Sequence, residues 1–113
     1  MIRRTSLAPA RPGESLHAPF RLDIEVAQVL RRFARRGEIG ARLGEEIISD
    51  LAGLPVCRHA HDYLLPRIWE LRDNLSACDA AYVALAELLE APLVTCDARL
   101  ATVPGHMAQI ELI

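Results

Sequence analysis

Three acidic residues stand at positions where a carboxylate is costly unless something binds it. Glu25 lies at the edge of the apolar stripe of a predicted helix, Asp79 opens the most apolar segment of the chain, and Asp97 follows the apolar run 93–96. A carboxylate at the margin of a core has to be paired, hydrogen-bonded or bound to a metal. Clustered carboxylate oxygens suit a hard cation such as Mg²⁺ or Mn²⁺, which can position a water for attack on a phosphodiester.

Each of these acids also has a purely structural interpretation. Asp79 lies three residues after a serine, as in a capping box. Asp97 could cap the short turn that follows it, and Glu25 could form an ion pair with Arg21 or Arg32. Against these readings, the end of a parallel strand and the start of a neighbouring helix share one edge of an α/β sheet, so Asp79 and Asp97 can converge.

The apolar periodicity predicts the elements that position these acids. Helices are predicted over 21–36, 41–53, 62–73 and 77–90, and the last is apolar nearly all round, which is typical of a buried helix. Strands are predicted over 15–18, 56–60, 93–96 and 109–113. Strands that alternate with helices indicate an α/β fold with a mainly parallel sheet.

The chain divides into an arm and a domain. Residues 1–14 have no helical or strand period and contain Pro9 and Pro12, which lack amide donors, so we expect an irregular N-terminal arm there. Residues 15–113 are expected to form the domain. With 113 residues, 51% of them hydrophobic, and a net charge of −2, the chain has the composition of one globular domain rather than of a disordered one.

Cysteine content and hydropathy exclude further classes. Three cysteines are too few, and odd in number, for a disulfide scaffold, which favours a reducing compartment and a cytoplasmic location. No apolar run approaches the roughly 20 residues that span a bilayer, so we expect no membrane association.

Some residues could bind nucleic acid. All 13 basic residues are arginines, and the densest group, four arginines within 31–36, could hold an RNA backbone or simply form a solvated helix face. Trp69 and Tyr82 could stack on bases, but their apolar helical spacing predicts that both lie in the core.

The cysteines and histidines offer one more set of candidates. Cys57, His59 and His61 alternate along a predicted strand, so they could share one face and bind zinc, although a half-exposed strand explains the same pattern. Cys78 and Cys96 each precede a candidate metal ligand; we expect them to be small buried side chains, the alternative being that their oxidation perturbs the site.

The three segments that carry the acids resemble those of PIN-domain nucleases. LDIEVAQVL at 22–30 resembles the glutamate-bearing helix of that family, and DAAYVALAE at 79–87 looks like its central aspartate helix. LVTCDARL at 93–100 is similar to the family's closing strand and aspartate. The order and spacing of the segments also agree, and the closest resemblance, over about 15–113, is to the VapC toxins of bacterial toxin–antitoxin pairs.

This resemblance implies a fold, an activity and partners. The fold would be a PIN-like three-layer α/β/α sandwich with a short, mainly parallel sheet. The activity would be that of an endoribonuclease that depends on Mg²⁺ (or Mn²⁺), acts on RNA, forms a homodimer and is neutralised by a small antitoxin protein. Glu25, Asp79 and Asp97 match the family's acidic metal-site positions, where they would be both metal ligands and catalytic residues, and Thr95 matches a supporting polar position.

One feature of the family pattern is not found. PIN-domain nucleases begin with a hydrophobic strand that ends in a fourth acid, whereas the only acid before Asp23 here is Glu14, so the first central strand is expected to be missing. The chain could be a degenerate relative, a truncated product, or a chain in which residues 1–14 or a partner strand replace that strand. The alternative function is therefore a catalytically degenerate PIN-like module that keeps dimer or antitoxin binding.

Overall fold

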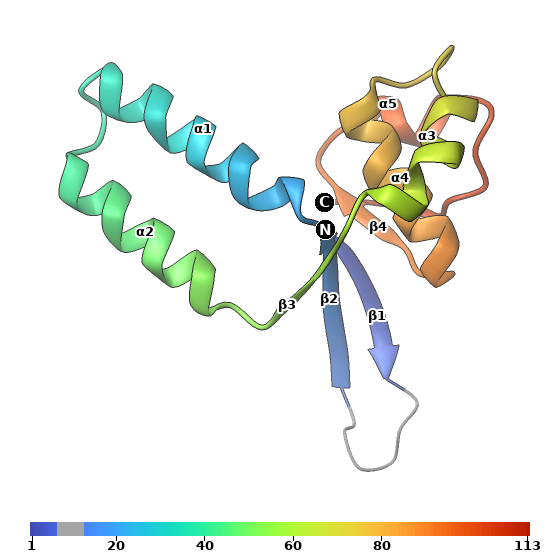
Figure 1. Cartoon of the computed structure of the whole chain (residues 1–113), viewed down its shortest axis with the longest axis horizontal. Coiled ribbons are helices and arrows are strands. Elements are labelled where there is room, and N and C mark those ends of the chain that lie inside the picture. Colours follow the sequence, from blue (N-terminus) through green and yellow to red (C-terminus); the bar gives the residue numbers. More distant parts are fainter. Residues whose placement is uncertain (7–12) are drawn as a thin grey trace. The chain divides into compact units, whose positions relative to one another are not determined.

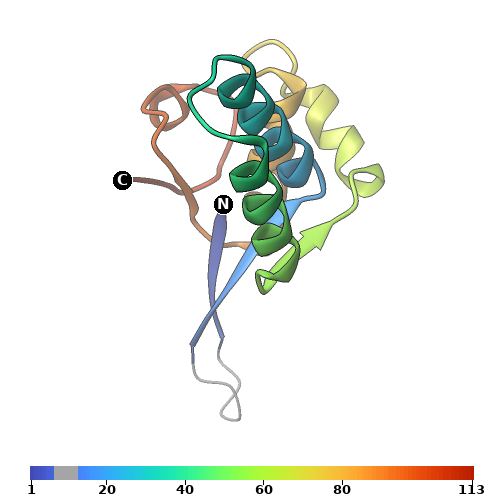
Figure 2. The same cartoon turned by 90° about the vertical axis from the view of Figure 1, so that its left-hand side faces the viewer.

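The structure is a computed structural model that describes residues 1–6 and 13–113. It divides into two compact units, which are described separately. The sheet unit comprises Met1–Pro19 and Val56–Ile113, and the helical unit comprises Phe20–Pro55. Figures 1 and 2 show the elements of both units from two directions.

A five-stranded sheet forms the centre of the sheet unit. Its order is β3-β2-β1-β4-β5, with β2 parallel to β3, β4 parallel to β5, and β1 antiparallel to both of its neighbours. Four of the five strands therefore run in one direction, as the sequence predicts, and their carboxyl ends lie along one edge. The strands are β1 (Ile2–Ser6), β2 (Gly13–Pro19), β3 (Val56–His59), β4 (Leu93–Thr95) and β5 (Ile110–Leu112).

The central position of this sheet is filled by the chain's own N-terminal segment. The expectation of an irregular arm is wrong for residues 2–6, which form β1, and the expected gap in the centre of the sheet is occupied by this strand. A segment between β2 and β4 can pair backbone groups that would otherwise be orphaned, and Ile2, which faces both His17 and Leu93, is fully buried there. The part of the expected arm at 7–12 lies outside the described residues.

Helix α4 (Ala77–Leu89) is the centre of the core. It packs on β1, β2 and β4 and against α3 (Leu65–Glu70), which Figure 1 shows beside it. The predicted burial of this helix is confirmed, because its core-facing residues are at most 4% exposed: Ala80, Ala81, Val83, Ala84, Leu85 and Ala86. The small alanines allow the close approach to the sheet that this packing requires.

The predicted helix over 62–73 is divided in the structure. A 3₁₀ turn, η1 (Asp62–Leu64), precedes α3, and α3 ends at Glu70. Pro66 stands in the first turn of α3, where the missing amide costs nothing and the fixed φ favours a fresh helix start. A last short helix, α5 (Arg99–Thr102), follows β4.

An ion network holds α3, α4 and the segment before β5 together. Arg67 donates from Nε and Nη2 to the two oxygens of Glu87, at 3.0 and 2.9 Å, and from Nη1 to Glu70 at 2.9 Å. The same guanidinium reaches the Gly105 carbonyl oxygen, and Glu87 also accepts the amide of Met107. Burial alone would raise the pKa of Glu87, but the bonds from Arg67 and Met107 outweigh it and lower that pKa.

The helical unit is a pair of helices, α1 (Arg21–Arg35) and α2 (Ala41–Gly53), that pack against each other. Both predicted ranges are confirmed to within a residue. Gly37 adopts a positive φ of 73° after α1, which a glycine accommodates without strain. No residue of either helix is buried. In the part of the chain that the structure describes, none of the helices has the length and apolar character needed to cross a bilayer.

Candidate functional site

Two of the predicted acids are fixed by local hydrogen bonds at the carboxyl edge of the sheet unit. Asp79 lies in the first turn of α4, where its amide donates to the Ser76 hydroxyl at 3.2 Å, so the predicted serine cap is present. Asp97 lies two residues after β4, and its amide donates to Oγ1 of Thr95 at 3.1 Å. Thr95 therefore contacts the turn that carries Asp97, and its supporting role at the site stays a prediction.

A single guanidinium connects these two carboxylates. Arg99 Nη2 lies 2.6 Å from Oδ2 of Asp97 and 4.0 Å from Oδ2 of Asp79. Arg99 also donates its Nε and its backbone amide to Asp97, each at 3.0 Å from Oδ1. These bonds lower the pKa of Asp97, and the bond to Asp97 raises the pKa of Arg99. We name Asp79, Asp97 and Arg99 the acid corner.

The acid corner offers oxygen ligands of the kind that Mg²⁺ and Mn²⁺ prefer. Both carboxylates are only partly exposed, at 38% and 32% of their side chains, and both face one cationic group. An arrangement that holds a guanidinium between two carboxylates is electrostatically suited to hold another cation there. The sequence gives no direct signal for Arg99, because its role depends on how α5 folds back on Asp97.

Glu25 lies in the helical unit. Its Oε1 is 3.1 Å from Nε of Arg21, one helical turn earlier, so one of the two ion pairs anticipated for it is formed. The side chains of both partners are partly exposed, at 37% for Glu25 and 42% for Arg21. The convergence of Glu25 with Asp79 and Asp97 stays a prediction.

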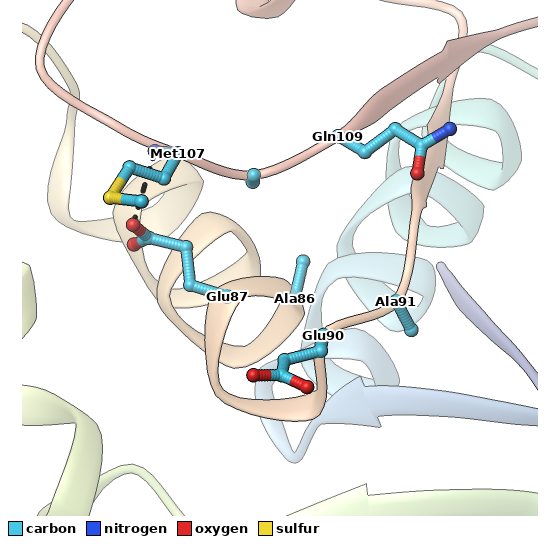
Figure 3. A pocket seen from close by; sticks show the side chains of 7 residues that line it. Ala86, Glu87, Glu90, Ala91, Met107 and Gln109 are labelled. Atoms are coloured by element: carbon cyan, nitrogen blue, oxygen red, sulfur yellow. Dashed lines mark hydrogen bonds between the residues drawn. The ribbon is translucent and has the colours of Figure 1, made fainter.

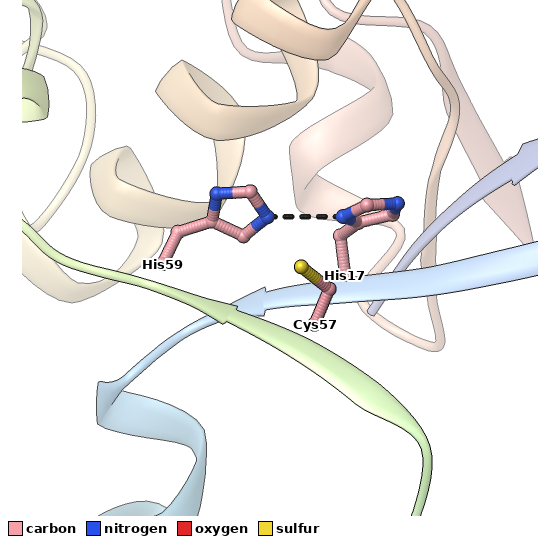
Figure 4. A group of neighbouring side chains, drawn as sticks. All are labelled: His17, Cys57 and His59. Carbon is pink, nitrogen blue, oxygen red and sulfur yellow. Dashed lines mark hydrogen bonds between the residues drawn. The ribbon is translucent and has the colours of Figure 1, made fainter.

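A second group of candidate ligands lies on β2 and β3. His17, Cys57 and His59 bring one ligand atom each to within 4.8 Å of one another, and Figure 4 shows the three side chains together. Among the described residues this is the one group of three or more such side chains that could hold a metal ion.

This group corrects the prediction for Cys57, His59 and His61. Cys57 and His59 do share a face of β3, but the strand ends at His59 and the third member is His17. His17 is the register partner of Cys57 on the neighbouring strand. Single-strand alternation cannot reveal that pairing, so a one-strand reading of the sequence misses His17.

The aromatic and cysteine predictions have mixed outcomes. Tyr82 packs against the core, as predicted. The prediction for Trp69 is wrong: its side chain is 68% exposed, and the Arg72 guanidinium lies 4.6 Å from its ring centroid. Cys96 is exposed rather than buried, and Cys78 is intermediate.

The four clustered arginines, in the last turns of α1 and just after it, are exposed, in agreement with a solvated face; an RNA contact there stays a prediction. They are Arg31, Arg32, Arg35 and Arg36.

A pocket opens elsewhere in the sheet unit, between the end of α4 and the segment before β5. It has a volume of about 380 Å³, and Figure 3 shows its lining side chains. Its one deeply placed acid, Glu87, is already engaged by Arg67 and by the Met107 amide. The pocket contains none of the predicted site residues, and its chemistry is structural rather than catalytic. The labelled lining residues are Ala86, Glu87, Glu90, Ala91, Met107 and Gln109.

Comparisons with known proteins assign this arrangement of elements to a family. The family model of the PIN domain matches residues 4–106, which include β2, both helices of the helical unit and both aspartates of the acid corner.

Ribonuclease VapC9 of Mycobacterium tuberculosis is 49% identical over 101 residues, which are 89% of this chain and 80% of the relative. Ribonuclease VapC12 of the same species is 42% identical over 101 residues, or 89% of this chain and 78% of the relative. Ribonuclease VapC1, also from that species, is 40% identical over 98 residues, or 86% and 74%.

Proposed function

The chain belongs to the PIN-domain family, and we propose that it is an endoribonuclease of the VapC type, the toxin of a toxin–antitoxin pair. The observation that carries the proposal is the acid corner: Asp79 and Asp97 face one cationic group at the carboxyl edge of the sheet. Ligands of α/β proteins bind at such edges. The relatives of similar sequence are named ribonucleases, which supports RNA as the substrate.

We propose that Asp79, Asp97 and Glu25 hold one or two Mg²⁺ or Mn²⁺ ions. When bound, the divalent ion would supply Lewis-acid activation of water and charge neutralisation at the phosphodiester. Asp79 and Asp97 are suited to this role because the backbone amide of each donates to a neighbouring hydroxyl, which fixes the backbone that carries it, and because both carboxylates lie near one guanidinium. Glu25 would add a third carboxylate from α1.

Arg99 has a defined part in this proposal. In the structure it neutralises Asp97 and approaches Asp79, so the two like charges are not left facing each other. A metal ion would take over that neutralisation, and the freed guanidinium would be available for the phosphate of the substrate. Arg99 is 78% exposed, which leaves it room to move.

The partners follow from the family. We propose a small antitoxin protein as the neutralising partner, a homodimer as the assembly and the cytoplasm as the location. The absence of disulfides among the three cysteines agrees with a reducing compartment. The exposed arginines of α1 are the candidate contacts for the RNA backbone.

The decisive experiment is cleavage of RNA by the purified chain with and without Mn²⁺. We expect cleavage that EDTA abolishes and that Asp79→Asn reduces about 100-fold or more, because a lost ligand costs at least as much as a lost partner of a ligand. Asp73→Asn is the matched control, since Asp73 is an exposed aspartate of the same unit. Cleavage that is equally strong in both variants would overturn the proposal.

Glu25 has its own matched control. Glu46 on α2 pairs with Arg42 one turn earlier, as Glu25 pairs with Arg21, so the two glutamates have the same local partner. If Glu25 is a metal ligand, Glu25→Gln lowers cleavage while Glu46→Gln does not. Equal effects would leave Glu25 as an ordinary helix ion pair.

One observation favours the second candidate, a degenerate module that binds a partner without catalysis. The central strand β1 has the sequence IRRTS and runs antiparallel, so it brings no acid to the carboxyl edge. The same assay decides between the two functions. Absence of metal-dependent cleavage, together with retained binding to a co-expressed antitoxin, would favour the degenerate module.

A further inference from the structure

The register of strands β2 and β3 brings together three side chains that can bind a metal ion. Their ligand atoms are nitrogen and sulfur, whereas those of the acid corner are oxygen. In the parallel pair β2–β3, His17 lies opposite Cys57, and Pro19 lies opposite His59. Residues 57 and 59 share a face of β3 because alternate residues of a strand do so. The register therefore places an imidazole, a thiol and a second imidazole on one patch, as Figure 4 shows.

The distances are close to those that a tetrahedral ion requires. Nδ1 of His17 lies 2.9 Å from Nε2 of His59, and all three ligand atoms lie within 4.8 Å of one another. Zinc bond lengths in a tetrahedron imply about 3.3 Å between two nitrogens and about 3.6 Å between nitrogen and sulfur. Small side-chain rotations would lengthen the nitrogen–nitrogen distance and shorten the distances from the nitrogens to the Cys57 sulfur, with no change in the strands.

The outer nitrogen of each imidazole is already held by a hydroxyl. Nε2 of His17 is 2.9 Å from the Ser15 hydroxyl, and Nδ1 of His59 is 3.0 Å from the Tyr63 hydroxyl. Histidine ligands of metals characteristically donate their second N–H to such a partner, which fixes the tautomer and the ring orientation. Here both hydroxyls can accept that N–H, and the two inner nitrogens, 2.9 Å apart, would then both present lone pairs to one ion.

Burial is graded across the patch. His17 is 9% exposed, His59 is intermediate and Cys57 is exposed. A bound ion would therefore have protein ligands on its inner side and an open outer position for water. Three protein ligands with one open position is the arrangement that catalytic and regulatory zinc sites use, whereas closed structural sites use four.

We propose that His17, Cys57 and His59 form a binding site for a single Zn²⁺ ion, separate from the Mg²⁺ or Mn²⁺ chemistry of the acid corner. Imidazole and thiolate are the ligands of borderline and soft ions, while Mg²⁺ prefers oxygen. The site would therefore select zinc over the ion of the proposed nuclease activity.

The test uses a chain in which Cys57 is the only thiol. In the Cys78→Ser, Cys96→Ser background we expect Co²⁺, used as a spectroscopic substitute for Zn²⁺, to give a thiolate-to-cobalt absorption band at one equivalent. Zn²⁺ should abolish that band by displacement and should slow the reaction of Cys57 with a thiol reagent, whereas Mg²⁺ should do neither.

The variants assign the ligands. Cys57→Ser and His59→Gln should each weaken Zn²⁺ binding more than about 100-fold, and Ser15→Ala about 10-fold, the range found for partners of ligands. His61→Gln is the matched control for His59, because it lies just beyond the strand, and it should leave binding unchanged. Circular dichroism of each variant, without metal, establishes that it folds.

Three results would overturn the proposal: no cobalt band at one equivalent, a band that persists in Cys57→Ser, or equal losses in His59→Gln and His61→Gln. Asp79→Asn should leave the band intact. The zinc proposal can therefore be overturned while the nuclease proposal holds, and the nuclease proposal can be overturned while the zinc proposal holds. The reason is that the two proposed sites have different ligands and different metal ions.

Discussion

Two arginines of the sheet unit each hold a carboxylate through two nitrogens, in very different surroundings. Arg67 forms an ion pair with Glu87 between α3 and α4, where the two side chains are 33% and 16% exposed. Arg99 forms an ion pair with Asp97 at the carboxyl edge of the sheet, where the two side chains are 78% and 32% exposed. Both pairs have nitrogen–oxygen distances below 3.1 Å, so contact distance alone does not distinguish them.

What separates the pairs is the number of further partners and the access of water. Arg67 also binds Glu70 and the Gly105 carbonyl, both accessible to water, so its removal leaves chiefly the Glu87 carboxylate unsatisfied in a partly buried place. Arg99 has one further charged neighbour, Asp79, at 4.0 Å, and water reaches it freely. The Arg67–Glu87 pair is therefore suited to stabilising the fold. The Arg99–Asp97 pair is open enough for another cation to replace Arg99.

The largest expected effect comes from the same substitution made at both arginines. Arg67→Gln should lower the free energy of unfolding by about 2 kcal/mol, because several charge-assisted hydrogen bonds are lost and Glu87 is left without its partner. Arg99→Gln should change it far less, because water screens an exposed ion pair. Urea denaturation of both variants provides the measurement, and equal losses would remove the distinction between the pairs.

The next largest effect is a pH dependence of the unfolding free energy, which comes from the Arg67–Glu87 pair. The folded-state pKa of Glu87 is lowered from its ordinary value of 4.5, so the unfolded state binds its proton first as the pH falls. The stabilisation is complete above pH 4.5 and is lost as the pH falls through the folded-state pKa.

Glu87→Gln tests this sign. The difference in unfolding free energy between the natural chain and the variant should be greatest at neutral pH and should shrink as the pH falls below 4.5. Asp97→Asn serves as the control, because Asp97 also has a lowered pKa but lies at an exposed pair. A difference for Glu87→Gln that stays constant with pH would show that the carboxylate charge is not what stabilises this junction.

A smaller effect is expected on metal affinity at the exposed pair, and it depends on the proposed nuclease site. Removal of the Arg99 charge should strengthen Mn²⁺ binding modestly, since a positive charge near the proposed ion is then removed. The measurement is calorimetric titration of Arg99→Gln with Mn²⁺, with Arg72→Gln as an exposed-arginine control. Weaker binding in Arg99→Gln would mean that Arg99 supports the ion instead of competing with it.

The sequence predicts those elements whose pattern is complete within one segment. Helices α1 and α2 have clear apolar periods, α4 is apolar nearly all round, and the apolar run before Asp97 identifies β4. The acids Asp79 and Asp97 could be brought to one edge by reasoning about parallel sheets alone. The position of Arg99 next to both acids could not be predicted. It depends on side-chain contacts of about 3 Å that Arg99 makes from the start of α5, a helix of four residues.

The features that sequence reasoning misses are those that depend on pairing between distant segments. The N-terminal residues have no strand period, yet they form β1 because β2 and β4 offer backbone partners on both sides. His17 joins Cys57 and His59 only through the β2–β3 register. Trp69 has the apolar spacing of a core residue but lies on a helix of six residues, too short for that spacing to decide its exposure.

Arg72 is a third arginine of the sheet unit and, like Arg99, it is exposed, so it extends the comparison of Arg67 with Arg99. It lies over the exposed Trp69 ring at 4.6 Å and donates to the Trp69 carbonyl oxygen at 2.9 Å, with no carboxylate involved. Arg72→Gln should therefore cost only about 0.5 kcal/mol of unfolding free energy, the value of an exposed cation–π contact. Trp69 is the single tryptophan of the chain, so its fluorescence reports the loss of the stacked guanidinium even where stability barely moves. A loss as large as that of Arg67→Gln would mean that solvent exposure does not rank the arginines, and the separation of structural from exchangeable pairs would fail with it.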